Sequence, residues 1–168
     1  MFSWAALAYS FKFIWSPIID NLRLPFKNYG HRKSWLLFSQ LMIVLSLIFI
    51  SFTDPSETLI LTAVGAVLIA FSSASQDIII DAYRIESAPQ IMQGALSSMY
   101  IAGYRIAMLI AGAGSLYLAS YLGVEIYNVN VWKTVYLTMA SLMMVGILTT
   151  IYSPEPNIRR KISLLNFN

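Results

Sequence analysis

The sequence predicts an all-helical, polytopic membrane protein with about five transmembrane helices. Of its 168 residues, 58% are hydrophobic and 11% are charged, whereas a soluble domain typically carries about 25% charged residues. Five apolar segments are each long enough to cross about 30 Å of hydrocarbon as a helix. The connections between them alternate between basic and non-basic. We therefore expect a bilayer to surround this chain.

The first predicted span covers residues 2–19 and is apolar except for Lys12, which interrupts it about 15 Å along the helix. No basic segment precedes it, so its pattern is not that of a cleavable signal peptide. The second predicted span covers residues 34–52 and contains no charge. We expect lipid to contact most of the surface of this second helix.

Three further spans are predicted at residues 58–80, 93–120 and 133–152. The third contains Asp77 near its end. The fifth has an uncharged interior that lipid can contact. The fourth contains Arg105 and repeats a small residue at every fourth position: Gly103, Ala107, Ala111, Ser115 and Ala119. Such a stripe lies on one helical face and typically allows a neighbouring helix to approach closely.

Basic residues predict how the spans are oriented. The connection at 20–33, the third connection and the tail at 153–168 carry bases: Arg23, Lys27, Arg32, Lys33, Arg84, Arg159, Arg160 and Lys161. The connections at 53–57 and 121–132 contain acids and no base. The positive-inside rule then predicts an outward N-terminus and a cytoplasmic tail. The tryptophans Trp4, Trp15, Trp35 and Trp132 lie near the predicted span ends, as aromatic belts do.

Lys12, Asp77 and Arg105 are the charged groups within predicted spans. An ionisable group in hydrocarbon costs several kcal/mol unless it faces a partner or water. We therefore expect the first, third and fourth helices to line an interior. For Lys12 and Arg105, a buried ion pair and the binding of an anionic substrate both remain open.

The stretch SASQDIIIDAYRIES, residues 73–87, places Asp77, Asp81 and Arg84 on one helical face. Paired aspartates occur in membrane phosphatidyltransferases, but the second acidic pair that such metal sites need is missing from this sequence. The alternative is a cluster of ion pairs at the cytoplasmic end, with Arg32 and Lys33 as partners. Such a cluster can hold one conformation closed.

The sequence offers no catalytic constellation. It has no cysteine, one histidine and no glycine-rich phosphate loop, so we expect neither enzyme activity, nor a metal site, nor a cofactor. The net charge of +3 comes from short basic runs between apolar segments, and these indicate membrane orientation rather than nucleic-acid binding.

Several blocks in order resemble the AmpG-type muropeptide permeases of the major facilitator superfamily. They are FKFIWSP at 11–17 with Asp20, LPF at 24–26, GHRKSW at 30–35, ASQDI at 74–78 with DAYR at 81–84, GYR at 103–105 and PEP at 154–156. The superfamily also contains related acetyl-CoA transporters. The resemblance covers nearly the whole chain and departs from the family at His31, where arginine is usual.

This resemblance implies that the five spans correspond to helices two to six of a larger transporter, in the N-terminal half of its fold. It implies a bacterial inner-membrane, proton-coupled permease that imports anhydro-muropeptides. Substrate contacts would come from Lys12, Gln76, Tyr104 and Arg105, and gate or coupling contacts from Asp20, Arg32, Lys33, Asp77, Asp81 and Arg84. A separately encoded second half, or an inactive remnant of a split gene, is also expected from the short length.

Overall fold

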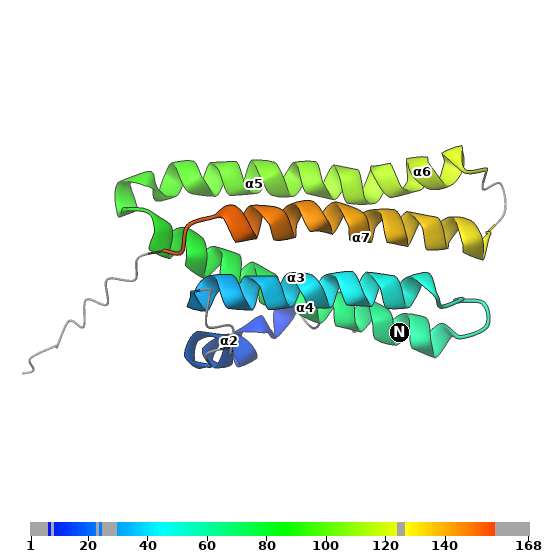
Figure 1. The fold of residues 1–168 in the computed structure, drawn as a ribbon, viewed down its shortest axis with the longest axis horizontal. Coiled ribbons are helices and arrows are strands. Elements are labelled where there is room, and N and C mark those ends of the chain that lie inside the picture. Colours follow the sequence, from blue (N-terminus) through cyan, green and yellow to red (C-terminus); the bar gives the residue numbers. More distant parts are fainter. Residues whose placement is uncertain (1–6, 8, 23, 25–29, 124–126, 157–168) are drawn as a thin grey trace, which may run out of the picture.

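The structure, a computed structural model, describes residues 7, 9–22, 24, 30–123 and 127–156, and every regular element in these ranges is a helix. Four helical segments are long and apolar enough to cross a membrane: His31–Ser51, Leu59–Ser87, Gln90–Tyr121 and Val129–Tyr152. They lie side by side as an elongated bundle (Figure 1). The predicted all-helical membrane fold is thereby confirmed.

The helices follow one another with short connections. In chain order they are α2 (Lys12–Asn21), α3 (His31–Ser51), α4 (Leu59–Ser87), the 3-10 turn η1 (Gln90–Met92), α5 (Gln93–Leu109), the π-helical turn η2 (Ile110–Gly114), α6 (Ser115–Tyr121) and α7 (Val129–Tyr152). The segments α5, η2 and α6 form one continuous rod (Figure 1). The first predicted span is described only in part, because Trp4 and residues 1–6 and 8 lie outside the described residues, as do Arg23, Lys27 and the basic tail from 157 onward.

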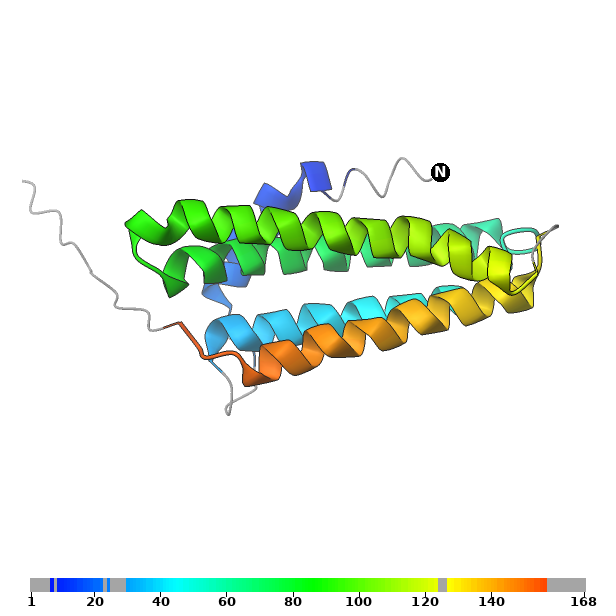
Figure 2. The same cartoon turned by 90° about the horizontal axis from the view of Figure 1, so that it is seen from above.

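Helix α3 is the most buried of the four long helices, and it packs along both α4 and α7 (Figure 2). This corrects the expectation that lipid contacts most of its surface. Many of its buried residues are small or polar: Ser34, Ser39, Gln40, Ser46 and Ser51. Small side chains let helices approach, and Gln40 Nε2 donates to Thr150 Oγ1 of α7 at 2.9 Å. Absence of charge therefore did not indicate contact with lipid.

Helix α4 continues beyond the predicted end at residue 80 and ends at Ser87. Asp77, Asp81 and Arg84 consequently lie on a helix rather than at a helix end or in a connection. The chain leaves the helix at Ala88, whose backbone is extended (φ −146°, ψ 153°). Pro89 follows, and a residue before proline disfavours the helical conformation.

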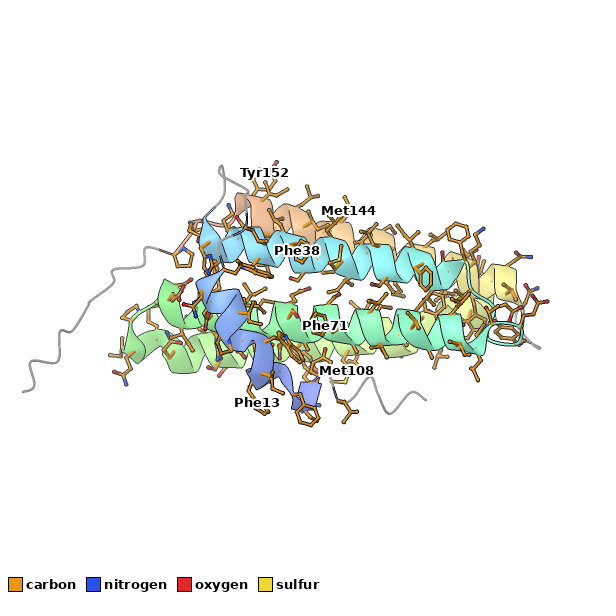
Figure 3. All side chains as sticks on the ribbon, turned by 90° about the horizontal axis from the view of Figure 1, so that it is seen from below. Phe13, Phe38, Phe71, Met108, Met144 and Tyr152 are labelled. Carbon is orange, nitrogen blue, oxygen red and sulfur yellow. The ribbon has the colours of Figure 1, made fainter. Side chains whose placement is uncertain are left out.

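Helix α2 crosses α4 near one end of the bundle (Figure 3). Trp15 of α2 packs on Phe71 of α4, with ring centroids 4.8 Å apart, while Phe13 points away from the bundle and is 66% exposed. Near this crossing a small apolar cluster joins α2, α3 and α4 through Ile19, Leu36 and Ile79.

Against the part of the chain that the structure describes, α5 buries none of its residues. A Cβ atom placed on Gly103 or Gly112 would meet no described atom within 4 Å. Of the predicted small-residue stripe, only Ala119 in α6 is buried, with 4% of its surface exposed. The stripe therefore packs against another described helix only at its C-terminal end, where α6 contacts α7.

Candidate functional site

Two side chains from two other helices contact Asp77 of α4. Lys12 Nζ of α2 donates to Asp77 Oδ2 of α4 at 3.0 Å, and the Tyr100 hydroxyl of α5 donates to Asp77 Oδ1. We call Lys12, Asp77 and Tyr100 the Lys12 cluster. The side chains of Lys12 and Asp77 are 38% and 26% exposed. Each charge in this predicted membrane interior thus has its opposite charge beside it, which is what such a charge requires.

One and two turns farther along α4, Asp81 and Arg84 connect the same helix to α5. Arg84 Nη2 donates to Asp81 Oδ1 at 3.2 Å, and Arg84 Nη1 donates to Ser97 Oγ at 2.5 Å. The guanidinium also lies 5.5 Å from the centroid of the Tyr100 ring. Arg84 therefore joins the charged face of α4 to the beginning of α5 and abuts the Lys12 cluster.

Arg32, the second residue of α3, bridges two other helices. Its Nη1 donates to Asp20 Oδ1 of α2 at 2.6 Å, and its Nη2 and Nε donate to the two Glu86 oxygens of α4 at 2.6 and 3.0 Å. We call Asp20, Arg32 and Glu86 the Arg32 cluster. Arg32 is only 9% exposed, and a guanidinium bound by a carboxylate in this two-pronged way is held with defined geometry. The cluster ties together the ends of α2, α3 and α4.

The segment that follows α7 contacts the beginning of α3. Glu155 accepts the backbone N–H groups of Arg32 and Lys33 at 3.0 and 3.2 Å, groups that a helix leaves without an internal partner at its first turn. In return, Lys33 Nζ donates to the Ile151 carbonyl at the end of α7, at 2.9 Å. The Tyr83 hydroxyl of α4 donates to the Pro154 carbonyl at 2.5 Å.

The pairing around α4 differs from the one expected from the sequence. We expected Asp77 and Asp81 to pair with Arg32 or Lys33, but the described carboxylate partners of Arg32 are Asp20 and Glu86. The reason is the rise of the helix, because Asp77 lies roughly 14 Å along α4 from Glu86. Asp77 and Asp81 instead pair with Lys12 and Arg84.

The predicted substrate-binding residues are not gathered into one site by the described contacts. Tyr104 and Arg105 are exposed on α5, and Arg105 forms no ion pair with any described residue, Asp77 included. Gln76 is half-buried, and its Oε1 atom is shielded with no hydrogen-bond partner in the described residues. Lys12 forms an ion pair with Asp77.

Four residues in these contacts had no assigned role from sequence reasoning: Glu86, Ser97, Tyr100 and Glu155. Glu86 stands in the charged stretch at 73–87 and Glu155 in the PEP block, so the sequence had already singled out the surroundings of both residues. Tyr100 and Ser97 carried none beyond their place on the same span as Arg105. Within the described ranges, the acidic and histidine side chains form no group of three or more that could hold a metal ion.

Comparison with protein families gives one match over almost the whole chain. The model described as "Major Facilitator Superfamily" matches residues 1–165. The match includes every residue of the Lys12 and Arg32 clusters.

Individual proteins that resemble the chain carry transporter names. The "Anhydromuropeptide permease" of Escherichia coli strain K12 is 38% identical over 156 residues, which cover 92% of this chain and 30% of the permease. The "Putative transporter AmpG 4" of Rickettsia conorii is 37% identical over 167 residues, which cover 98% of this chain and 39% of that protein. The chain therefore spans about a third of the length of these relatives.

Proposed function

Because the chain belongs to the Major Facilitator Superfamily, we propose that it forms part of a secondary-active permease that imports anhydro-muropeptides into the cytoplasm. The chain is a multi-pass membrane protein, with four described helices that can span a bilayer. The observation that carries the proposal is its 38% identity, over 92% of its length, to a protein named for anhydromuropeptide transport. The remaining helices of the carrier would come from a further segment or a second polypeptide.

The Lys12 cluster supports a role in coupling transport to protons. The Asp77 carboxylate has a cation on one oxygen and a phenol on the other, so adding a proton to Asp77 would release Lys12 and leave its charge without a partner. A charge in this position requires water or an anion. Proton binding at Asp77 would thereby change how α2, α4 and α5 are held together, and it would free Lys12 for an anionic substrate.

The Arg32 cluster supports a gate at the predicted cytoplasmic end. It joins α2 and α4 to α3 through Asp20 and Glu86. If α2 moves away from α4, Arg32 must therefore lose its contact with Asp20 or with Glu86. Asp81, Arg84 and Lys33 reinforce the same end. A cluster that exists in one conformation and not in the other shifts the population between them.

Arg105 and Tyr104 support substrate contact because they are exposed on a helix whose face the described residues leave uncovered. A guanidinium is permanently charged and matches carboxylate groups, which muropeptides carry. Gln76 lies next to Asp77 on α4 and would add a polar contact. The carrier would lie in the bacterial inner membrane, and the basic connections favour an orientation with the N-terminus out and the C-terminus in.

The decisive experiment replaces the matching 156 residues of the Escherichia coli permease with those of this chain and measures uptake of radiolabelled anhydro-muropeptide into inverted and right-side-out membrane vesicles. We expect inward uptake that a protonophore abolishes. Asp77→Asn in this chimera should abolish uptake driven by the proton gradient and leave exchange of labelled for unlabelled substrate within about threefold of the parent. Exchange needs no net proton movement.

Gln90→Asn, at the start of η1 and outside both clusters, is the matched control and should leave both activities unchanged. A chimera that inserts in the membrane at normal levels without any uptake would contradict the proposed substrate. Uptake of acetyl-CoA in place of muropeptide would select the related transporter class.

A further inference from the structure

A cavity lies beside the α3–α4 connection and the start of α7, at the end of the bundle opposite the Arg32 cluster. It has a volume of about 210 Å³ and lies between the end of α3, the start of α4 and the start of α7. Its lining includes Ile50, Thr62, Tyr127, Trp132, Lys133 and Tyr136. Neither cluster described above contributes to it.

Lys133 is the unusual residue in this lining. The connections at this end of the molecule contain only acids, so a base here opposes the orientation rule. Lys133 is half-buried, its Nζ atom lies 4.4 Å from the centroid of the Phe52 ring, and it forms no ion pair with any described residue. A ring face attracts an ammonium but does not neutralise it. The ammonium group of Lys133 is therefore available to bind an anion.

Two aromatic side chains of α7 line the same cavity as this lysine. Trp132 and Tyr136 are half-buried on the first turns of α7, with ring centroids 6.2 Å apart. The hydroxyl of Tyr136 and the indole N–H of Trp132 donate to no described acceptor. Amphipathic rings of this kind prefer the level of the lipid headgroups, and their free donors suit an acceptor-rich group such as a phosphate.

A carboxylate stands beside the same cavity. Asp54 lies between two residues of the lining, Thr53 and Pro55. Its Oδ1 atom accepts the Ser56 backbone N–H at 2.8 Å and the Tyr127 hydroxyl at 3.3 Å. Slight burial and the neighbouring Asp54 charge raise the pKa of the Tyr127 phenol, and a phenol is in any case a hydrogen-bond donor at physiological pH. The other Asp54 oxygen accepts no described hydrogen bond.

We propose that this cavity binds the headgroup of a membrane phosphatidylethanolamine, with its phosphate at Lys133 and its ammonium at Asp54. The pair of opposite charges matches the two charges of this headgroup. The volume is below the roughly 300–1,000 Å³ of pockets that enclose whole ligands, so it fits a headgroup whose acyl chains remain in the bilayer. The apolar part of the lining, such as Ile50, suits the glycerol end.

The test is native mass spectrometry of the chain, purified in a mild detergent and mixed with phosphatidylethanolamine, with phosphatidylglycerol, or with soluble phosphoethanolamine. We expect phosphatidylethanolamine to be retained at least threefold more than phosphatidylglycerol, and soluble phosphoethanolamine to be lost on purification. Lys133→Met should lower retention at least fivefold. Lys133→Arg should keep it within about twofold, and Asp54→Asn should abolish the preference between the two lipids.

Lys161→Met, which removes a charge from the tail, is the control and should not alter retention; helix content by circular dichroism checks that each variant is folded. Equal retention by Lys133→Met and the parent would overturn the proposal, as would retention of soluble phosphoethanolamine alone. Glu125 lies outside the described residues, and a rise in retention on Glu125→Gln would show that this carboxylate occupies Lys133 instead, which also overturns the proposal. None of these outcomes depends on muropeptide transport.

Discussion

Glu155 holds the beginning of α3 in place by accepting the backbone N–H groups of Arg32 and Lys33. A carboxylate from a distant part of the chain here does what a capping side chain usually does locally, since Gly30 at the N-cap has no side chain to offer. The Arg32 side chain can then reach Asp20 and Glu86 from a fixed backbone. Glu155 is therefore a positioning residue for the Arg32 cluster.

Removing this cap should loosen the helix end. Glu155→Ala should lower the free energy of unfolding by about 0.5–2 kcal/mol, the range for loss of a helix cap, as measured by thermal unfolding in detergent. Gly30→Ala should act on the same contact, because a Cβ on Gly30 would lie 2.0 Å from the Glu155 Cδ atom. The two effects should not add in the double variant.

Glu57→Ala, at an exposed position in the opposite connection, is the matched control and should change stability by less than about 0.5 kcal/mol. Additive losses from Gly30→Ala and Glu155→Ala would mean that the two residues act independently.

Individual charge partners were harder to predict than the charged residues themselves. The sequence indicates that Lys12 needs a carboxylate, because an ammonium in hydrocarbon is costly, and the structure supplies Asp77. It does not indicate that Arg32 chooses Glu86 over Asp81, because both carboxylates stand on one helix. That choice depends on how far α3 is shifted along α4, a tertiary quantity that spacing within one helix does not contain.

Between whole helices, Gly65 sets the approach of α4 to the end of α3. A Cβ at this position would lie 2.4 Å from Ile50 Cγ1 and 3.1 Å from Phe49 Cδ1. Without a hydrophobic driving force inside the bilayer, close packing of this kind supplies much of the attraction between helices.

Gly65→Ala should therefore separate the two helices and destabilise the chain by about 1–3 kcal/mol, the usual cost of overpacking. Unfolding in detergent by SDS titration measures this loss. Adding Ile50→Ala should recover part of the loss by making space. Gly94→Ala is the control, because its Cβ would meet no described atom within 4 Å; a loss there equal to that at Gly65 would refute the steric explanation.

For the molecule as a whole, the connections fall into two groups at opposite ends of the bundle (Figure 1). The chain has no cysteine, so single cysteines report each end without background. In intact cells, Ser56→Cys and Asn128→Cys should react with a membrane-impermeant maleimide, and Gln90→Cys should react only after the membrane is opened. The reverse pattern would invert the orientation and with it the placing of the gate.

The second to fifth spans were predictable, because length and apolar content decide whether a helix can cross a bilayer, and the four long described helices confirm them. The first predicted span lies partly outside the described residues and stays a prediction. Burial was not predictable. The uncharged segment 34–52 was expected to face lipid, yet α3 lies between two helices, and α5 with its small-residue stripe is the helix that the described residues leave uncovered. Which side of a helix is buried depends on its neighbours, so neither the absence of charge on α3 nor the small residues on α5 predicted it.

The π-helical turn at Ile110–Gly114 changes the direction in which the two ends of the small-residue stripe face. Gly103 and Ala119 are sixteen residues apart, so on a uniform α-helix, at about 100° per residue, they would differ in direction by roughly 160°. A π turn holds one residue more than an α turn and offsets about 100° of this winding. The turn therefore brings the two ends of the stripe towards the same side of the rod, although among the described residues only the Ala119 end is covered.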